Sequence, residues 1–158
     1  MSFDNIQVQV DRRFQGHVQP EPLHQAARAT LVHQHVDESY ALVVVVTGDD
    51  ALRELNRRHR GVDEPTDVLA FPGQALGPFV AAPDQPRHLG DVVVSFHRAE
   101  AQAADAGHDA QAELQLLVVH GVLHLLGYDD GTEERRMRMW AAQAEILQAL
   151  EVKARLPA

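Results

Sequence analysis

The sequence contains no cysteine among its 158 residues. This absence excludes disulfide bonds, zinc sites built from thiolates and a cysteine nucleophile. The sequence also has no apolar run of membrane-spanning length, and its start, "MSFDNIQVQV", lacks the basic and apolar segments of a secretory signal. We therefore expect a cytoplasmic protein with no membrane partner.

Lysine is nearly absent, because all but one of the 14 basic residues are arginines. The formal net charge of −9 argues against a protein that coats nucleic acid without specificity. A local basic segment, "RELNRRHR", nevertheless carries Arg53, Arg57, Arg58 and Arg60 against the single acid Glu54. Arginine presents a planar fork to phosphate oxygens, so a local phosphate site is compatible with the acidic total.

The composition, 45% hydrophobic and 23% charged, is typical of a globular protein, and the length suits one domain, residues 1–158. Apolar alternation and β-branched runs predict strands, and helical periodicity predicts helices. The predicted strands are 5–10, 40–48, 66–72 and 89–96, the helices are 21–36, 49–60, 97–106, 109–126 and 132–150, and a long loop covers 73–88. This order predicts an α+β fold in which a small mixed β-sheet packs on helices.

Two histidines stand four residues apart in the apolar stretch "HGVLHLLGYDD", residues 120–130. Positions i and i+4 of a helix share one face, so His120 and His124 can bind one metal ion. The alternative is a pair of core histidines that only make hydrogen bonds; the spacing favours the metal. Gly127 is expected to end the helix by a left-handed turn, which could bring Asp129 or Asp130 to the same ion.

The residue after the first histidine is Gly121, whereas zinc peptidases of the H-E-x-x-H type have their general base there. The peptidase interpretation is weaker for that reason.

Three segments together resemble the YbeY family of single-domain, metal-dependent endoribonucleases of ribosomal RNA maturation. "HGVLHLLGYDD" resembles the family signature H-G-x-L-H-L-x-G-Y-D-H. "LNRRHRGVDEPTDVLAFP" and "LGDVVVS" resemble two further family segments, and the three blocks occur in the family's order over most of residues 52–130. Departures are Asp130 at the family's third histidine, Ala70 at a common serine and His59 at an aromatic position.

The resemblance implies a zinc ion held at His120, His124 and position 130, on a central, zincin-like helix. It also implies that Arg60 faces this metal across a cleft and binds the scissile phosphate. Two histidines and one carboxylate form a known catalytic ligand set, and the carboxylate makes manganese or iron possible beside zinc. We expect Asp130 to be the third ligand, with Asp129 as the fallback.

A competing role for Asp130 is the N-cap of the last helix, since Glu133 follows it by three residues; Thr132 is another candidate cap. Arg57 and Arg58 are expected to be surface charges that steer RNA. Thr66 and Asp67 are expected to form a turn.

The sequence thus predicts an endoribonuclease that cleaves single-stranded RNA, in particular ribosomal RNA, with the ribosomal subunit or its assembly factors as partners. The alternatives are a non-catalytic ribosome-assembly factor with a structural metal, and a zinc peptidase-like hydrolase. A closed site with four protein ligands would favour the assembly factor, and an open metal position would favour an enzyme.

Overall fold

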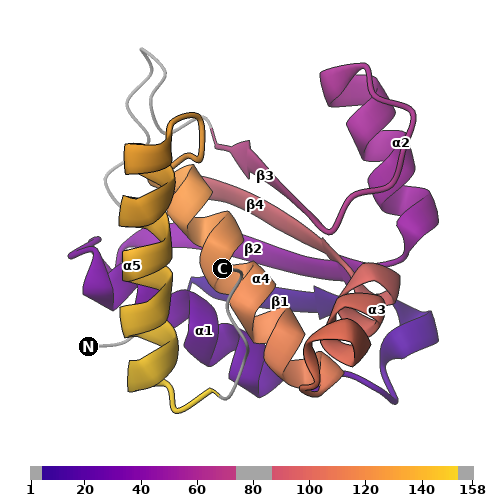
Figure 1. Ribbon diagram of the computed structural model, residues 1–158, viewed down its shortest axis with the longest axis horizontal. Helices are drawn as coiled ribbons and strands as arrows, with labels where there is room; N and C mark the ends of the chain where they lie inside the picture. The colour runs from indigo at the N-terminus through magenta and orange to yellow at the C-terminus, as the bar shows by residue number, and fades with distance from the viewer. Residues whose placement is uncertain (1–4, 74–86, 153–158) are drawn as a thin grey trace.

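The computed structural model describes residues 5–73 and 87–152, which form a β-sheet with helices packed on it (Figure 1). Its strands are β1 (Ile6–Val10), β2 (Tyr40–Thr47), β3 (Val68–Pro72) and β4 (Arg87–Ser95). Its helices are the short 3-10 helix Arg12–Phe14, then α1 (Pro20–His33), α2 (Asp49–Arg60), α3 (Phe96–Ala106), α4 (Ala110–Leu125) and α5 (Glu133–Ala149). No helix of the described ranges has the length and apolar character needed to cross a membrane.

The sheet has four strands in the order β1-β2-β4-β3. The first three are mutually parallel, and β3 lies antiparallel to β4 at the edge. The prediction of a mixed sheet in an α+β fold is confirmed. The description of the fold as zincin-like stays a prediction.

The two faces of the sheet are covered differently. Val92 and Val94 of β4 belong to the main core with α1, α3, α4 and α5, whereas Val93 packs in a small cluster with Leu52 of α2 and Leu69 of β3. Alternate residues of a strand point to opposite faces, so α2 lies across the sheet from the other helices. In Figure 1, α2 accordingly stands apart from the helical layer, beyond β3.

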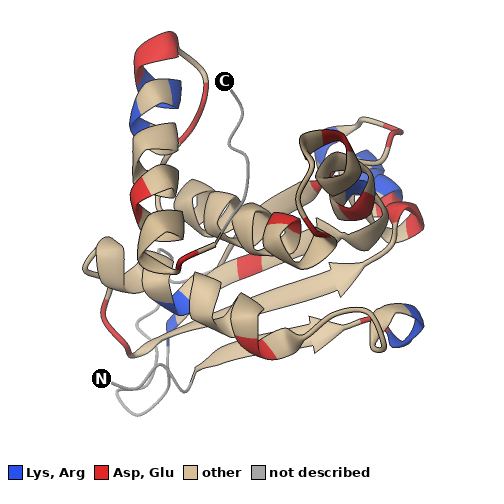
Figure 2. Cartoon of the chain, turned by 60° about the horizontal axis from the view of Figure 1, so that its bottom comes forward, with Lys and Arg blue, Asp and Glu red and all other residues tan. Residues whose placement is uncertain are grey.

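Helix α4 lies at the centre of the main core. It begins at the N-cap Asp109, whose carboxylate accepts a hydrogen bond from the backbone N–H of Ala112 (2.7 Å). Its buried residues occur on all sides of the helix, which is typical of a helix surrounded by other elements. Charged residues instead occur mainly on the outer helices and on turns, with few on the strands (Figure 2).

The predicted boundaries are accurate to one residue for α3, α4 and α5, and element ends commonly fray over that distance. Helix α1 ends three residues earlier than predicted, and the following His35 has a positive φ of 58°. The predicted loop 73–88 is wrong at Arg87 and His88, which belong to β4. Its residues 74–86 lie outside the described ranges.

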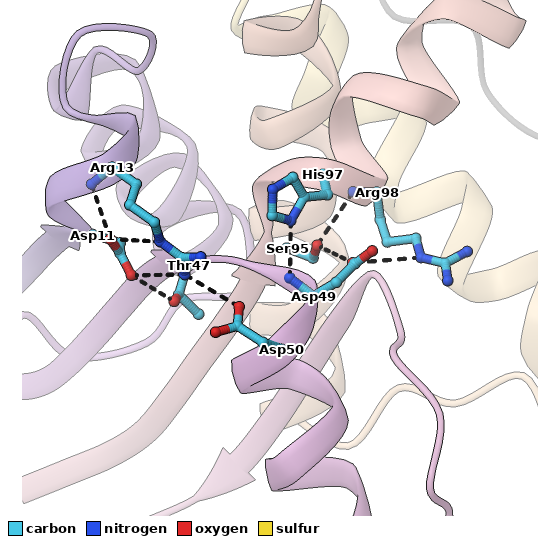
Figure 3. A network of polar contacts seen from close by, with 8 residues as sticks. All are labelled: Asp11, Arg13, Thr47, Asp49, Asp50, Ser95, His97 and Arg98. Atoms are coloured by element: carbon cyan, nitrogen blue, oxygen red, sulfur yellow. Dashed lines mark hydrogen bonds and ion pairs between the residues drawn. The ribbon is translucent and has the colours of Figure 1, made fainter.

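A network of polar side chains links the carboxyl ends of β1, β2 and β4 to α2 and α3 (Figure 3). Asp11 accepts hydrogen bonds from the backbone and side chain of Arg13 and from the hydroxyl of Thr47 (2.9–3.2 Å). The second nitrogen of the Arg13 fork also reaches Asp50 (3.2 Å). These contacts connect the β1 end to β2 and to the first turn of α2.

The Asp11 carboxylate is expected to make the stability of the fold pH-dependent. Hydrogen bonds from the side chain and the backbone of Arg13 lower the pKa of Asp11 from 3.8 to about 2. A carboxyl whose pKa falls on folding stabilises the protein above its unfolded pKa, and this contribution disappears as the pH drops through the folded value. Asp11→Asn should therefore reduce the free energy of unfolding at pH 6, and the difference from the parent should vanish between about pH 4 and pH 2.

Urea unfolding of parent and variant across this pH range measures the effect. Asp105→Asn is the matched control, because Asp105 is exposed on α3 and should change stability little at any pH. A stability difference for Asp11→Asn that stays constant down to pH 2 would contradict the assignment.

Candidate active site

His120 and His124 lie on the C-terminal half of α4, and both side chains are half-buried. Their rings approach edge to face, with centroids 4.6 Å apart. The Nε2 atoms of the two rings face each other at 3.0 Å. The predicted i, i+4 arrangement therefore brings two imidazole nitrogens to one point, where they could hold one metal ion together.

The pKa of His124 suits metal binding. Burial lowers the pKa of His124 below its ordinary value, and repulsion from His120 lowers it further, while Asp130 opposes this shift. A histidine must be neutral to coordinate a metal. The other ring nitrogen of His120, Nδ1, contacts the side-chain oxygen Oε1 of Gln143 on α5.

Gly121 allows α4 to lie close to the sheet. A Cβ atom at this position would stand 2.5 Å from Cγ1 of Val92 and 3.2 Å from Cγ2 of Val68. Contacts of that length would push the helix away from β4 and β3 and so displace the neighbouring His120. The glycine that separates this sequence from the peptidase pattern thus has a packing reason, and a glutamate would not fit there.

The turn after α4 forms as the sequence predicts. Gly127 has a left-handed φ of 98°, and the N–H of Tyr128 donates to the carbonyl of Leu123 (3.0 Å). These features define a helix end of the Schellman type. The chain then reverses and brings residues 128–130 back beside the end of α4.

The two aspartates of this turn have different surroundings. Asp129 accepts a hydrogen bond from the N–H of Gly131 (2.9 Å) and pairs loosely with Arg135 (3.5 Å). Asp130 is exposed. Of the two candidate caps of α5, the structure selects Thr132, whose hydroxyl accepts from the N–H of Arg135 (3.1 Å), and not Asp130.

Arg60 lies in the last turn of α2, which ends at Gly61 with a left-handed φ of 71°. The other arginines of this helix are engaged with acids: Arg53 with Asp63, and both Arg57 and Arg58 with Glu54. No ion pair of Arg60 occurs within residues 5–73 and 87–152, and the side chain is exposed. Arg60 is thus available to an anionic ligand.

The loop that follows Arg60 is tied back to α2. Arg53 makes two hydrogen bonds to the carboxylate of Asp63 (2.8 and 3.1 Å). The side-chain amide of the buried Asn56 donates to the carbonyl of Glu64 (2.9 Å). These bonds hold the segment that leads from Arg60 to β3 and so determine where Arg60 stands relative to the sheet.

One cavity of about 420 Å³ lies between α4, β3 and the end of α2. It brings together all four residues that the sequence predicts for the site, and it is lined by Arg60, Asp67, Val68, Leu69, Ala70, Pro72, His120, Gly121, His124, Leu125 and Asp130. Asp129 instead lines a second hollow with Arg135 and Arg138. The cavity geometry therefore favours Asp130 over Asp129 as the neighbour of the histidines.

The imidazole and carboxylate side chains at the cavity are of the types that bind metal ions. Within the part of the chain that the structure describes, no three histidine, aspartate or glutamate side chains already converge as a complete ligand set. The facing Nε2 atoms of His120 and His124 supply two donors, and the exposed Asp130 stands at the same cavity. Because the Asp130 side chain is exposed, its carboxylate can turn toward the two histidines and act as the third donor.

The comparisons with known proteins agree with these observations. The family model described as Endoribonuclease YbeY matches residues 6–151.

The chain belongs to the YbeY family.

A relative named Endoribonuclease YbeY from Chloroflexus aurantiacus is 47% identical over 137 residues, covering 84% of this chain and 88% of that protein. One of the same name from Roseiflexus sp. (strain RS-1) is 42% identical over 149 residues, covering 92% of each chain. The solution structure of a Thermotoga maritima protein aligns with a TM-score of 0.55 at 24% identity, covering 92% of this chain and 91% of that one. That structural likeness supports the fold of the YbeY chain described here.

Two residues near the site are not assigned there by the sequence. Asp67 lines the cavity, and its carboxylate accepts from the N–H of Val68 (2.8 Å) and from Gln102 (3.3 Å). Gln143 contacts His120 from a helix whose sequence indicates only packing. The sequence feature that could have identified Gln143 is that a polar residue occupies a position among apolar residues of this helix. His97 lies outside the cavity and accepts from the N–H of Asp49 (3.0 Å).

Proposed function

We propose that this chain is a metal-dependent endoribonuclease that cleaves single-stranded RNA, and that ribosomal RNA is its substrate. The observation that carries the proposal is a cavity lined both by two facing histidines and by an arginine that has no ion pair among the described residues. The relatives named Endoribonuclease YbeY support the reaction class. The ribosomal subunit or its assembly factors are the proposed partners, and the cytoplasm is the proposed location.

In this proposal His120, His124 and Asp130 hold one zinc ion, and the carboxylate makes manganese or iron acceptable as well. When bound, such a metal polarises phosphate oxygens and lowers the pKa of a coordinated water. Arg60 binds the scissile phosphate through its planar fork and neutralises the charge that develops on the non-bridging oxygens. The half-buried setting of the histidines strengthens these interactions relative to those in open water.

The two alternative functions are less well supported. A zinc peptidase of the H-E-x-x-H type needs a base at position 121, where the glycine packs against Val92. A structural zinc is enclosed by four protein ligands, whereas this histidine pair opens onto a cavity. An open coordination position is what a hydrolytic enzyme requires.

The function is tested by cleavage assays on one metal-loaded sample with its metal content measured. We expect internal cleavage of a single-stranded RNA, little cleavage of a fully paired duplex and none of an unstructured peptide. Chelation should abolish the RNA cleavage, and zinc should restore it. Peptide cleavage without RNA cleavage would support the peptidase, and stoichiometric metal with no cleavage of either would support the assembly factor.

Asp130→Ala tests the third ligand of this proposal. Loss of a direct ligand should weaken metal binding well beyond the ~10–100-fold typical of a group that only supports a ligand. Asp130→His should retain the metal, because imidazole is also a good zinc ligand. The measurement is a competition titration of the purified protein against a chromophoric chelator.

Asp129→Ala is the matched control, because Asp129 lies next in sequence but lines the other hollow. It should leave metal affinity within the range of a supporting group. If Asp130→Ala binds metal as tightly as the parent, Asp130 is not a ligand, and a larger loss for Asp129→Ala would assign the role to Asp129.

A further inference from the structure

Gln143 is a buried polar residue on an otherwise apolar face of α5. Its side chain is 1% exposed, and the buried residues around it on the helix are Met139, Ala142, Ile146 and Leu147. Burying an amide without a hydrogen-bond partner destabilises the folded protein. An apolar residue would pack at this position without that cost, so the amide is expected to serve the group that it contacts.

The group that it contacts is the candidate metal ligand His120. The side-chain oxygen Oε1 of Gln143 is hydrogen-bonded to Nδ1 of the His120 ring. A carbonyl oxygen can only accept, so Nδ1 carries the proton of the neutral imidazole. The proton on Nδ1 leaves the lone pair on Nε2, which is the atom that faces Nε2 of His124 at 3.0 Å.

We propose that Gln143 is a positioning residue that holds His120 in the Nδ1–H tautomer and aims its Nε2 lone pair at the metal. This inference rests on the proposed metal site. The contact spans two helices, so it also fixes the rotation of the ring relative to α4. Partners of this kind on the second nitrogen of a metal-ligating histidine commonly change metal affinity by about 10–100-fold.

The hydrogen bond can be removed in two ways. Gln143→Met keeps the length and approximate volume of the side chain but has no oxygen acceptor. Gln143→Asn keeps the amide and withdraws it by one methylene from His120, so it provides a second removal if the methionine variant folds poorly. Gln143→Glu keeps an acceptor oxygen at the original reach and serves as the conservative rescue.

Two measurements test whether Gln143 acts on the metal site through His120. Zinc affinity, from competition with a chelator, should fall by about 10–100-fold in Gln143→Met and Gln143→Asn and be retained in Gln143→Glu. Nitrogen-15 NMR of the metal-free protein should show His120 as the Nδ1–H tautomer in the parent and a shift toward the Nε2–H form in the two removal variants. Ile146→Met, equally buried one turn along α5, should change neither result.

The outcomes separate this inference from the proposed function. A parent protein that takes up no zinc would overturn the metal site and the positioning role with it. A parent that binds zinc, together with Gln143→Met and Gln143→Asn variants of equal affinity and unchanged tautomer, would overturn the positioning role alone. An equal loss of affinity in Ile146→Met would show that packing of α5, and not the hydrogen bond, supports the site.

Discussion

Replacement of His120 or His124 by alanine should remove the bound metal and reduce RNA cleavage on the order of a thousandfold or more. The metal is expected to contribute several kcal/mol of transition-state stabilisation, and each 1.36 kcal/mol corresponds to a factor of ten in rate. The two Nε2 atoms face each other at 3.0 Å and are the two proposed nitrogen donors to the same ion. The histidine that remains in a single variant cannot supply both donors. Either single variant should therefore lose the site.

The same variants should lose the stabilisation that metal binding gives the fold. A ligand present at one hundred times its dissociation constant raises the free energy of unfolding by about 2.7 kcal/mol. The parent should accordingly show a higher unfolding midpoint in zinc than in chelator, and the two variants should show almost no difference. Elemental analysis and thermal unfolding with and without zinc measure these effects.

His88→Ala is the matched control for the histidine variants. His88 is also half-exposed, but it pairs with Asp91 on β4 (3.1 Å) and does not line the cavity. It should keep full metal occupancy and the zinc-dependent stabilisation. Full occupancy in both His120→Ala and His124→Ala would refute the metal assignment.

Arg60→Ala should keep the fold and the metal but lose about 2–4 kcal/mol of transition-state stabilisation, as expected for the loss of one preorganised donor. This corresponds to a decrease of about 30- to 900-fold in kcat/KM. Arg60→Lys should recover only part of the loss, because an ammonium group cannot reproduce the two parallel hydrogen bonds of a guanidinium. The assay is single-stranded RNA cleavage by zinc-loaded protein.

Arg58→Ala is the control that separates phosphate contact from general attraction of RNA. Arg58 lies on the same helix, is exposed and is engaged with Glu54 (3.1 Å). Its removal should act mainly on the salt dependence of RNA binding and little on the rate at saturating RNA. Unchanged cleavage by a folded Arg60→Ala protein would exclude the proposed contact of Arg60 with the scissile phosphate.

Local features of the site could be predicted because their physical causes lie within a few residues. The spacing of His120 and His124 on one helix face follows from the helical repeat. The reversal at Gly127 follows from the freedom of glycine to adopt a positive φ, here 98°. The α+β order likewise follows from apolar alternation and helical periodicity along the chain.

The identity of the helix cap could not be predicted, because Asp130 and Thr132 both satisfy the local pattern. The structure assigns the cap to Thr132, and this leaves Asp130 exposed at the cavity. The choice depends on the path of the chain after Gly127, which is determined by how α5 packs on α4. Local hydrogen-bonding preference alone does not contain that information.

The sequence by itself determined which residues can hold a metal and bind phosphate, through residue chemistry, helical spacing and the family motifs. The family motifs also implied that Arg60 faces His120 across a cleft, and the tertiary structure places both residues at one cavity. Only the tertiary structure decided that Gln143 reaches Nδ1 of His120 from another helix. These contacts join segments that are distant along the chain. They depend on the strand order β1-β2-β4-β3 and on the close approach of Gly121 to Val92. Burial of the shared core sets both, and the packing of a core depends on every element at once rather than on any one stretch of sequence.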